Sequence, residues 1–237
     1  MHLDIAPARN PEALFKTLRG VDLSVPGRTE GRKTYHAETW TICRLLSTLA
    51  AANRFTFPIS VTHRDRPDFL IQDASAKIGV EVTEAIPEQY AAYCALAERD
   101  FPGVLRELAH FRWGSPERTV EEMRALLRQN QLSSAGWEGD DPEREWALFI
   151  RSAVDTKLTK LARTDFMKFD QNWLSIYDNL PMPNINLAEA IGLLRPLLED
   201  RWSGTSFFDT LLVEHGPVIA RVTAKGSDHL VLKDLWE

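Results

Sequence analysis

The sequence is poor in cysteine and has no long apolar run. Its 237 residues include two cysteines, Cys43 and Cys94, which lie far apart in the chain. This spacing excludes a disulfide framework and a CxxC metal knuckle, so reduced thiols in a cytoplasmic protein are expected. The longest apolar stretches, such as Leu45 to Ala52, fall well short of the roughly 18 residues that cross a bilayer. The amino terminus lacks a basic segment followed by an apolar run, so we expect neither a signal peptide nor a membrane anchor.

An excess of positive charge is also missing. The formal net charge is −6, whereas proteins that coat nucleic acid are basic over much of their surface. A role on nucleic acid would therefore need a local basic patch. Two groups of residues could form one, and their side chains would bind phosphates; the alternative is that they lie in solvated loops. The groups are Arg28, Arg32 and Lys33, and Arg64 with Arg66.

Several common catalytic signatures do not occur. The histidines form no HExxH motif or other closely spaced set, which argues against zinc chemistry. GxGxxG, Walker A and GxSxG patterns are missing, which argues against nucleotide-binding, kinase-like and serine-hydrolase functions. His36 and His63 are close in sequence to acidic residues considered below. Each is more often a surface or hydrogen-bonded histidine than a substrate contact.

What the sequence does contain is the pattern of an α/β protein. Hydrophobic residues make up 44% of the chain and charged residues 26%, as in ordinary globular proteins. Apolar periodicity predicts helices and short strands in alternation, and their order is α-β-β-β, an insertion, then α-β-α-β-β. The expected helices are 34–53, 142–164 and 187–201, the last with a break near Pro196, and the expected strands are 55–61, 66–72, 77–85, 172–179, 206–215 and 217–224.

Two segments lie outside this pattern. Residues 1–33, rich in Pro and Gly, predict a short helix near 11–18 within a peripheral amino-terminal arm. Residues from about 88 to 140 predict a helical insertion, with helical composition over 88–110 and 116–130 and a loop over 133–143. The remainder, 34–237, is expected to be a single domain.

Charged residues interrupt the apolar faces of two predicted helices. Lys157 and Lys160 fall within the apolar arc of helix 142–164. Lysines are seldom buried unless they are paired, so negative groups should lie opposite them. Glu38 similarly projects into the apolar stripe of helix 34–53. The alternative is that these long side chains reach the rim of the core. The apolar arc of helix 142–164 consists of Trp146, Phe149, Ile150, Ala153 and Leu161.

The second and third predicted strands place two acidic residues opposite each other. A hairpin whose turn is centred midway between positions 74 and 75 puts Asp68 across from Glu81, with β-carbons roughly 5 Å apart. Two such charges destabilise a sheet unless a cation lies between them, and Mg²⁺ or Mn²⁺ prefers oxygen ligands. By alternation Thr83 shares the face of Glu81, and Glu84 points away. The alternative is the exposed polar face of an edge hairpin.

These residues resemble the PD-(D/E)XK nuclease superfamily over about 34–86 and 143–178. The PD dipeptide matches Pro67-Asp68, the E-x-K triplet matches Glu81-Val82-Thr83, and Glu38 occupies the place of a first-helix glutamate. The resemblance implies a restriction-endonuclease-like α/β fold. Such a fold has a mixed central sheet flanked by helices, here with a helical insertion and a carboxyl-terminal α/β extension.

The resemblance also implies a function and its residues. Asp68, Glu81 and Glu38 would bind Mg²⁺ or Mn²⁺ in a nuclease that hydrolyses phosphodiester bonds, with DNA the expected substrate and RNA left open. Thr83 replaces the family's lysine, which would have moved to Lys157 or Lys160 on the later helix.

Lys157 is preferred because it is nearer the centre of the apolar arc. Thr83, Arg64 and Arg66 are expected to contact substrate, and a second copy of the chain, in a homodimer, is another candidate partner. The alternative is a nuclease-fold binding or assembly protein without catalysis, which Thr83 and the acidic net charge favour.

Overall fold

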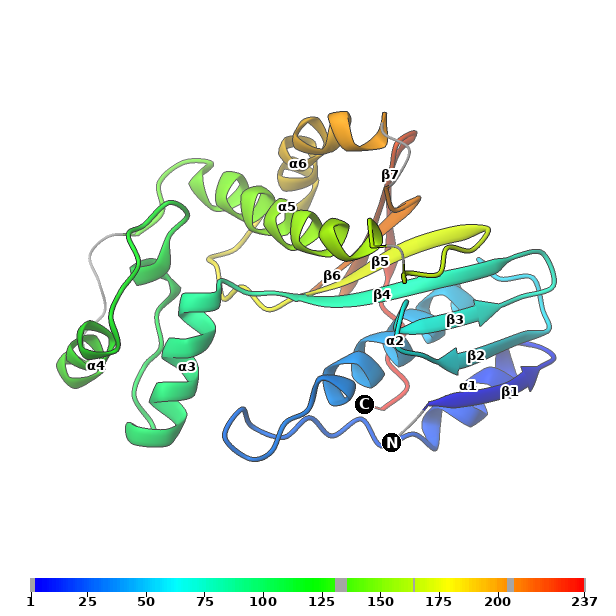
Figure 1. The fold of residues 1–237 in the computed structure, drawn as a ribbon, viewed down its shortest axis with the longest axis horizontal. Helices are drawn as coiled ribbons and strands as arrows, with labels where there is room; N and C mark the ends of the chain where they lie inside the picture. The colour runs from blue at the N-terminus through cyan, green and yellow to red at the C-terminus, as the bar shows by residue number, and fades with distance from the viewer. Residues whose placement is uncertain (1–2, 131–135, 164, 204–206, 237) are drawn as a thin grey trace.

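An open mixed β-sheet forms the centre of the computed structural model, which describes residues 3–130, 136–163, 165–203 and 207–236 (Figure 1). Within these residues the sheet has eight strands in the order of the sequence. They are β1 (Asp4–Ala8), β2 (Ile59–His63), β3 (Phe69–Gln72), β4 (Lys77–Ala85), β5 (Gln171–Asp178), β6 (Thr210–His215), β7 (Val218–Thr223) and β8 (Gly226–Val231). The pairs β4–β5 and β5–β6 are parallel, and the other neighbouring pairs are antiparallel.

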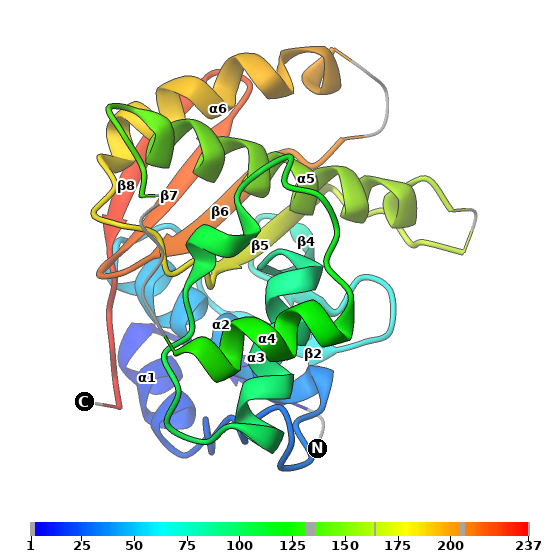
Figure 2. The same cartoon turned by 90° about the vertical axis from the view of Figure 1, so that its left-hand side faces the viewer.

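Helices cover both faces of the sheet, which confirms the prediction of an α/β protein with a mixed central sheet. One face is covered by α1 (Pro11–Arg19) and α2 (Thr34–Ala51). The other face is covered by α5 (Asp141–Leu161) and α6 (Leu187–Trp202). Figure 2 shows α5 and α6 on the opposite side of the strands from α1 and α2. Two apolar cores result: Leu46 of α2 packs in one core with Val80 of β4, and Trp146 of α5 packs in the other with Ile176 of β5.

The hairpin of β3 and β4 has the register that the sequence predicted. The pairs are Phe69 with Val80, Leu70 with Gly79, Ile71 with Ile78 and Gln72 with Lys77. Strand β3 is short, whereas β4 continues from Glu81 to Ala85 beyond its partner. Asp68 stands directly before β3, and its Oδ2 accepts a hydrogen bond of 2.7 Å from the backbone N–H of Val82. The two strands therefore separate at Asp68 and Glu81.

The helices that flank this fork differ slightly from their predicted ranges. Helix α2 ends at Ala51, because Asn53 takes a left-handed backbone conformation (φ 54°) that ends a helix. Helix α5 ends at Leu161, and Thr164, its predicted end, lies outside the described residues. Helix α6 runs through Pro196, where a break was expected. Positions 133–135 of the predicted loop and Ser206, the predicted start of a strand, also lie outside the described residues.

The amino-terminal segment is more than the peripheral arm that was expected. Residues Asp4–Ala8 form β1, which pairs with β2, and Leu3, Ile5 and Leu14 are buried in the core. Proline is tolerated there because an edge strand leaves one side unpaired. Strand β8 at the opposite edge was not expected, because Leu230 is its one buried side chain.

The insertion forms a helical lobe at one end of the sheet. It contains α3 (Glu88–Asp100), a 3₁₀ turn at Leu108–Phe111 and α4 (Val120–Gln129). The helix expected over 88–110 is interrupted after Asp100, where Pro102 and then Gly103, with φ 82°, begin a turn. Among the described residues, no helix combines the length and apolar character that a membrane crossing requires.

Candidate active site

Two acidic residues and a lysine meet at the fork between β3 and β4. The ammonium of Lys157 donates a hydrogen bond of 2.7 Å to Oε1 of Glu81 and lies 3.9 Å from Oδ2 of Asp68. The side chains are 10%, 4% and 13% exposed, respectively. Because an unpaired charge in such surroundings is costly, the lysine stabilises both carboxylates. A negative group therefore lies opposite Lys157, as the helix pattern predicted.

Apolar packing fixes the direction of these side chains. On α5, the buried side chains of Ile150, Val154 and Leu161 turn the face that carries Lys157 toward the sheet. On β4, Val80 and Val82 pack into the core with α2, so alternation directs Glu81 to the α5 side.

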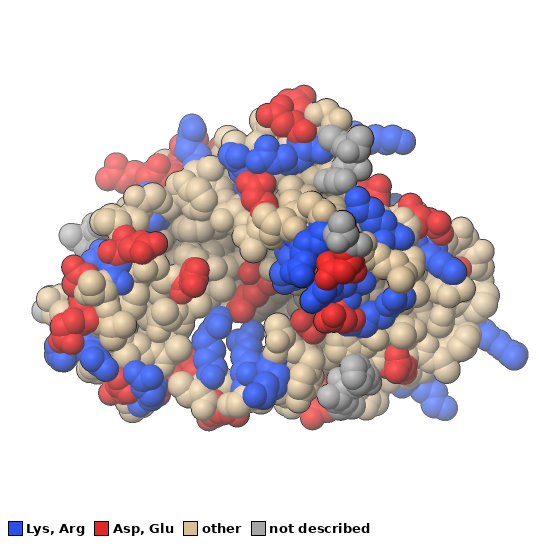
Figure 3. Space-filling view, viewed as in Figure 1, with Lys and Arg blue, Asp and Glu red and all other residues tan. Residues whose placement is uncertain are grey.

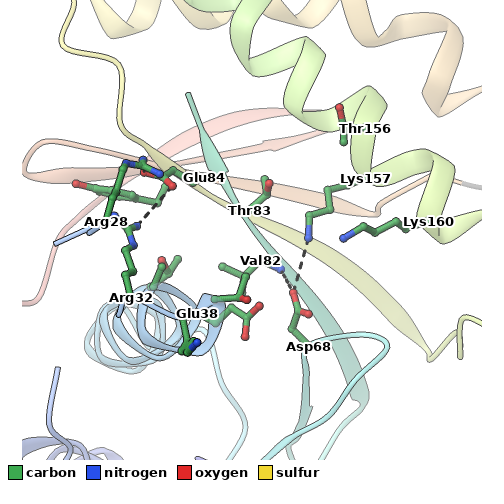
Figure 4. A pocket seen from close by; sticks show the side chains of 15 residues that line it. Arg28, Arg32, Glu38, Asp68, Val82, Thr83, Glu84, Thr156, Lys157 and Lys160 are labelled. Carbon is green, nitrogen blue, oxygen red and sulfur yellow. Dashed lines mark hydrogen bonds and ion pairs between the residues drawn. The ribbon is translucent and has the colours of Figure 1, made fainter. Parts of the chain in front are cut away.

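Glu38 reaches the same place from α2. It lines a cavity together with Asp68 and Lys157, and Figure 4 shows its carboxylate directed toward Asp68. Its Oε2 lies 3.6 Å from Nε2 of His63. Burial raises the pKa of Glu38; the charge of Lys157 lowers it, and that of Glu81 raises it. Glu38 is thus close enough to interact electrostatically with Lys157 and Glu81, as its place on the apolar stripe of the helix suggested.

The positive charge of Lys157 does not fully offset the effects that raise the pKa of the Asp68 carboxyl. Burial, followed by the negative charge of Glu81, raises the pKa of Asp68 to about 7. Lys157 and the hydrogen bond from Val82 oppose this shift but do not cancel it, and Glu38 adds to it. Near neutral pH the Asp68 carboxyl therefore gains or loses a proton readily, and additional positive charge would hold it ionised.

A cavity of about 520 Å³ opens on this cluster. Its lining contains five cationic side chains and three carboxylates, so it is more positive than negative although the chain as a whole is acidic. Figure 3 shows a hollow in the centre of one face with blue side chains gathered beside it. The charged lining residues are Arg28, Arg32, Lys33, Lys157 and Lys160, and Glu38, Asp68 and Glu84.

A smaller cavity of about 210 Å³ lies on the other side of Asp68. Glu81 and Lys160 line it, together with Arg66 and Arg163. Lys160 borders both cavities, and its ammonium is 4.0 Å from Oε1 of Glu81. Its side chain is 53% exposed, so it is held far less firmly than Lys157.

The other expected contacts are divided between the two cavities and the surface. Thr83 lines the larger cavity, and Arg66 lines the smaller one and pairs with Asp165. Arg64 belongs to neither lining among the described residues; its guanidinium lies 5.4 Å from the ring centre of Phe169. Arg64 is half-buried, and its expected contact with substrate stays a prediction.

Glu84 was expected to point away from the site, and this expectation is wrong. Alternation does place it on the face opposite Glu81, but the cavity continues past the end of β3 and reaches that face. Its carboxylate binds Arg28 at 2.9 Å and Arg32 at 3.5 Å and accepts a hydrogen bond from the amide of Asn179. The unequal lengths of the two strands were the available signal, because β4 beyond β3 has a free edge.

Carboxylates alone do not form a complete metal cage here. In the described part of the chain, no group of three or more His, Cys, Asp or Glu side chains is arranged to hold a metal ion. The chain was compared with protein-family models, with curated proteins and with solved structures, and none of these comparisons found a match.

Proposed function

We propose that this chain is a divalent-metal-dependent nuclease of the PD-(D/E)XK type, with DNA as the expected substrate. The observation that carries the proposal is the meeting of Asp68, Glu81 and Lys157 at a strand fork that borders a cationic cavity. Positive side chains attract a phosphodiester and would hold it beside the carboxylates. A restriction-endonuclease-like fold, with a helical insertion at about 88–140 and a carboxyl-terminal α/β extension, belongs to the same proposal.

The acidic residues fit a hard cation such as Mg²⁺ or Mn²⁺, which prefers oxygen ligands. Oε2 of Glu81 is buried and accepts no hydrogen bond from the described residues. Burial raises the pKa values of Asp68 and Glu38 more than the charge of Lys157 lowers them, so a bound cation would favour their ionised forms. Asp68 and Glu81 would hold the ion, and Glu38 would bind directly or through water. When bound, such an ion lowers the pKa of a water and polarises the phosphate.

Lys157 takes the role that Thr83 cannot fill, because threonine carries no positive charge. Its ammonium touches the carboxylate pair, where it can orient the attacking water and offset the charge that develops on the phosphate oxygens. Lys160, with its side chain 53% exposed at the rim, could contact the phosphate backbone of a nucleic-acid strand. Arg66 and Thr83 line the two cavities on either side.

Cleavage assays test this proposal directly. Labelled single- and double-stranded DNA and RNA are incubated with the protein in Mg²⁺, in Mn²⁺ and in EDTA. We expect cleavage with metal alone, and its loss in Asp68→Asn and in Glu81→Gln. Glu199→Gln is the matched control, because Glu199 is an exposed residue of α6 that lines neither cavity. Cleavage near the wild-type rate by either active-site variant would show that the site is misassigned.

A second candidate function is binding or assembly without catalysis. It is favoured by Thr83 at the lysine position and by Lys157, which already pairs with both carboxylates. Calorimetry with Mn²⁺ separates the two functions. Binding that disappears in Glu81→Gln supports the nuclease, whereas oligonucleotide binding without any metal binding supports the second function.

A further inference from the structure

Two arginines at one end of the larger cavity share a single carboxylate. Nη2 of Arg28 and Nη2 of Arg32 donate to the two different oxygens of Glu84, at 2.9 Å and 3.5 Å. The amide of Asn179, directly after β5, donates to the same carboxylate. Figure 4 shows this cluster at the end of the cavity remote from Lys157 and Lys160. The long segment between α1 and α2 is thus fastened to β4 by its two arginines.

The cluster retains positive charge and hydrogen-bond donors. One carboxylate neutralises one of the two guanidiniums, and Lys33 adds a further charge to the same cavity wall. Each guanidinium has five N–H donors, and among the described residues its one hydrogen-bond acceptor is Glu84. Phosphate matches these donors, because its oxygens accept paired hydrogen bonds from the planar fork of arginine.

We propose that Arg28 and Arg32, oriented by Glu84, form a phosphate-binding subsite for the nucleic-acid strand that is cut at Asp68 and Glu81. The inference rests on the proposed nuclease function. Glu84 lies three residues beyond Glu81 on β4, about 10 Å along the strand. Stacked nucleotides advance about 3.4 Å each, so the subsite holds a phosphate within about three nucleotides of the scissile one. Glu84 acts through the arginines and is a positioning residue.

Oligonucleotide binding in EDTA tests the subsite without requiring cleavage. The affinity of a short fluorescent oligodeoxynucleotide is measured by anisotropy at several salt concentrations. Arg28→Gln and Arg32→Gln should each weaken binding about tenfold, as expected for a lost charged hydrogen bond. Each should also reduce the slope of log K against log salt by roughly 0.7 to 0.9. Arg144→Gln is the matched control, because Arg144 pairs with Asp140 near the start of α5, far from the cavity.

The role of Glu84 is tested by a double-mutant cycle. Glu84→Gln should weaken binding a few-fold although it removes a negative charge, because the arginines lose their orientation. In that background Arg28→Gln should have a smaller effect than in the wild type. Additive effects would show that Glu84 merely anchors the segment. Arg32→Lys, which keeps the charge but not the fork, should weaken binding less than Arg32→Gln, and circular dichroism checks that each variant is folded.

Oligonucleotides with 5′-hydroxyl, 5′-phosphate or 3′-phosphate ends identify the source of the phosphate. Equal losses for all three support an internal phosphodiester, and a loss confined to one phosphorylated end supports a strand terminus. If the wild type cleaves while Arg28→Gln and Arg32→Gln bind with unchanged affinity and salt slope, the subsite is refuted and the nuclease stands. If the wild type binds none of the oligonucleotides, the subsite is also refuted. If the wild type does not cleave but the arginine variants lose affinity, the nuclease proposal fails and the subsite stands.

Discussion

Replacing Asp68 by asparagine should stabilise the folded protein in alkaline, metal-free buffer. Burial, followed by the charge of Glu81, raises the pKa of Asp68 from 3.8 to about 7 in the fold. The folded state therefore binds this proton more tightly than the unfolded chain does. The contribution of the group to stability is fully present below about pH 4 and is lost as the pH rises through 7.

The magnitude follows from the size of the shift. A difference of about three pKa units corresponds to on the order of 4 kcal/mol, which the ionised carboxyl costs the fold above pH 8. Asparagine has nearly the same shape and keeps an oxygen that can accept from the N–H of Val82. It removes the cost but also the attraction to Lys157. We therefore expect Asp68→Asn to raise the Tm at pH 8.5 by roughly 3 to 9 °C, with little change at pH 4.

Thermal and urea unfolding in EDTA at several pH values measure this effect. Asp73→Asn is the control in the same hairpin, with the opposite sign. Burial would raise the pKa of Asp73, but hydrogen bonds from Thr56, Ser75 and Ala76 outweigh it and hold the pKa below its ordinary value. Its contribution is present above the unfolded pKa and is lost as pH falls, so Asp73→Asn should lower the Tm at pH 7. An Asp68→Asn protein less stable than wild type at pH 8.5, or a difference that does not vary with pH, would refute the reasoning.

Four further substitutions test the cluster, the strand beside it and a separate ion pair. Lys157→Ala should slow single-turnover cleavage on the order of a hundredfold, and Lys160→Ala should cost less; equal losses would contradict the preference for Lys157. Gly79→Ala would place a β-carbon 2.9 Å from Pro67, the residue before Asp68. We expect a clear loss of cleavage rate with a small decrease in Tm, and an unchanged rate would show that the strand can shift without disturbing the site. Arg44→Met removes the guanidinium that binds Glu214 at 2.9 Å in the core; we expect a loss of about 3 to 5 kcal/mol in urea unfolding, and an unchanged midpoint would contradict it.

The hairpin was predictable because its evidence is local. A short turn fixes the register of two adjacent strands, and that register alone placed Asp68 beside Glu81. The position of Lys157 was predictable for a related reason. Helical periodicity showed that its ammonium faces the sheet, and the cost of burying a charge required a carboxylate there.

The arginine cluster was not predictable in the same way. Arg28 and Glu84 are far apart in sequence, and their contact depends on the path of a segment without regular structure. The edge strands also escaped prediction. In β8 burial alternates along the strand, but Leu230 is the one buried side chain and the exposed Val231 follows it directly, so the residue types do not show the apolar–polar alternation that marks a half-buried strand.

A buried carboxylate with a raised pKa is insufficient to identify a site, and Glu214 shows why. Burial raises its pKa too, and its Oε2 also lacks a hydrogen bond from the described residues. Glu214 pairs with Arg44, however, and the carboxyl-terminal segment closes over that arginine through Asp234. Glu214 lines neither of the two cavities described above. Asp68 borders both cavities, each lined by cationic side chains. A cation that enters either cavity could stabilise the ionised Asp68 carboxylate, and this access is what distinguishes the fork of β3 and β4 as the candidate site.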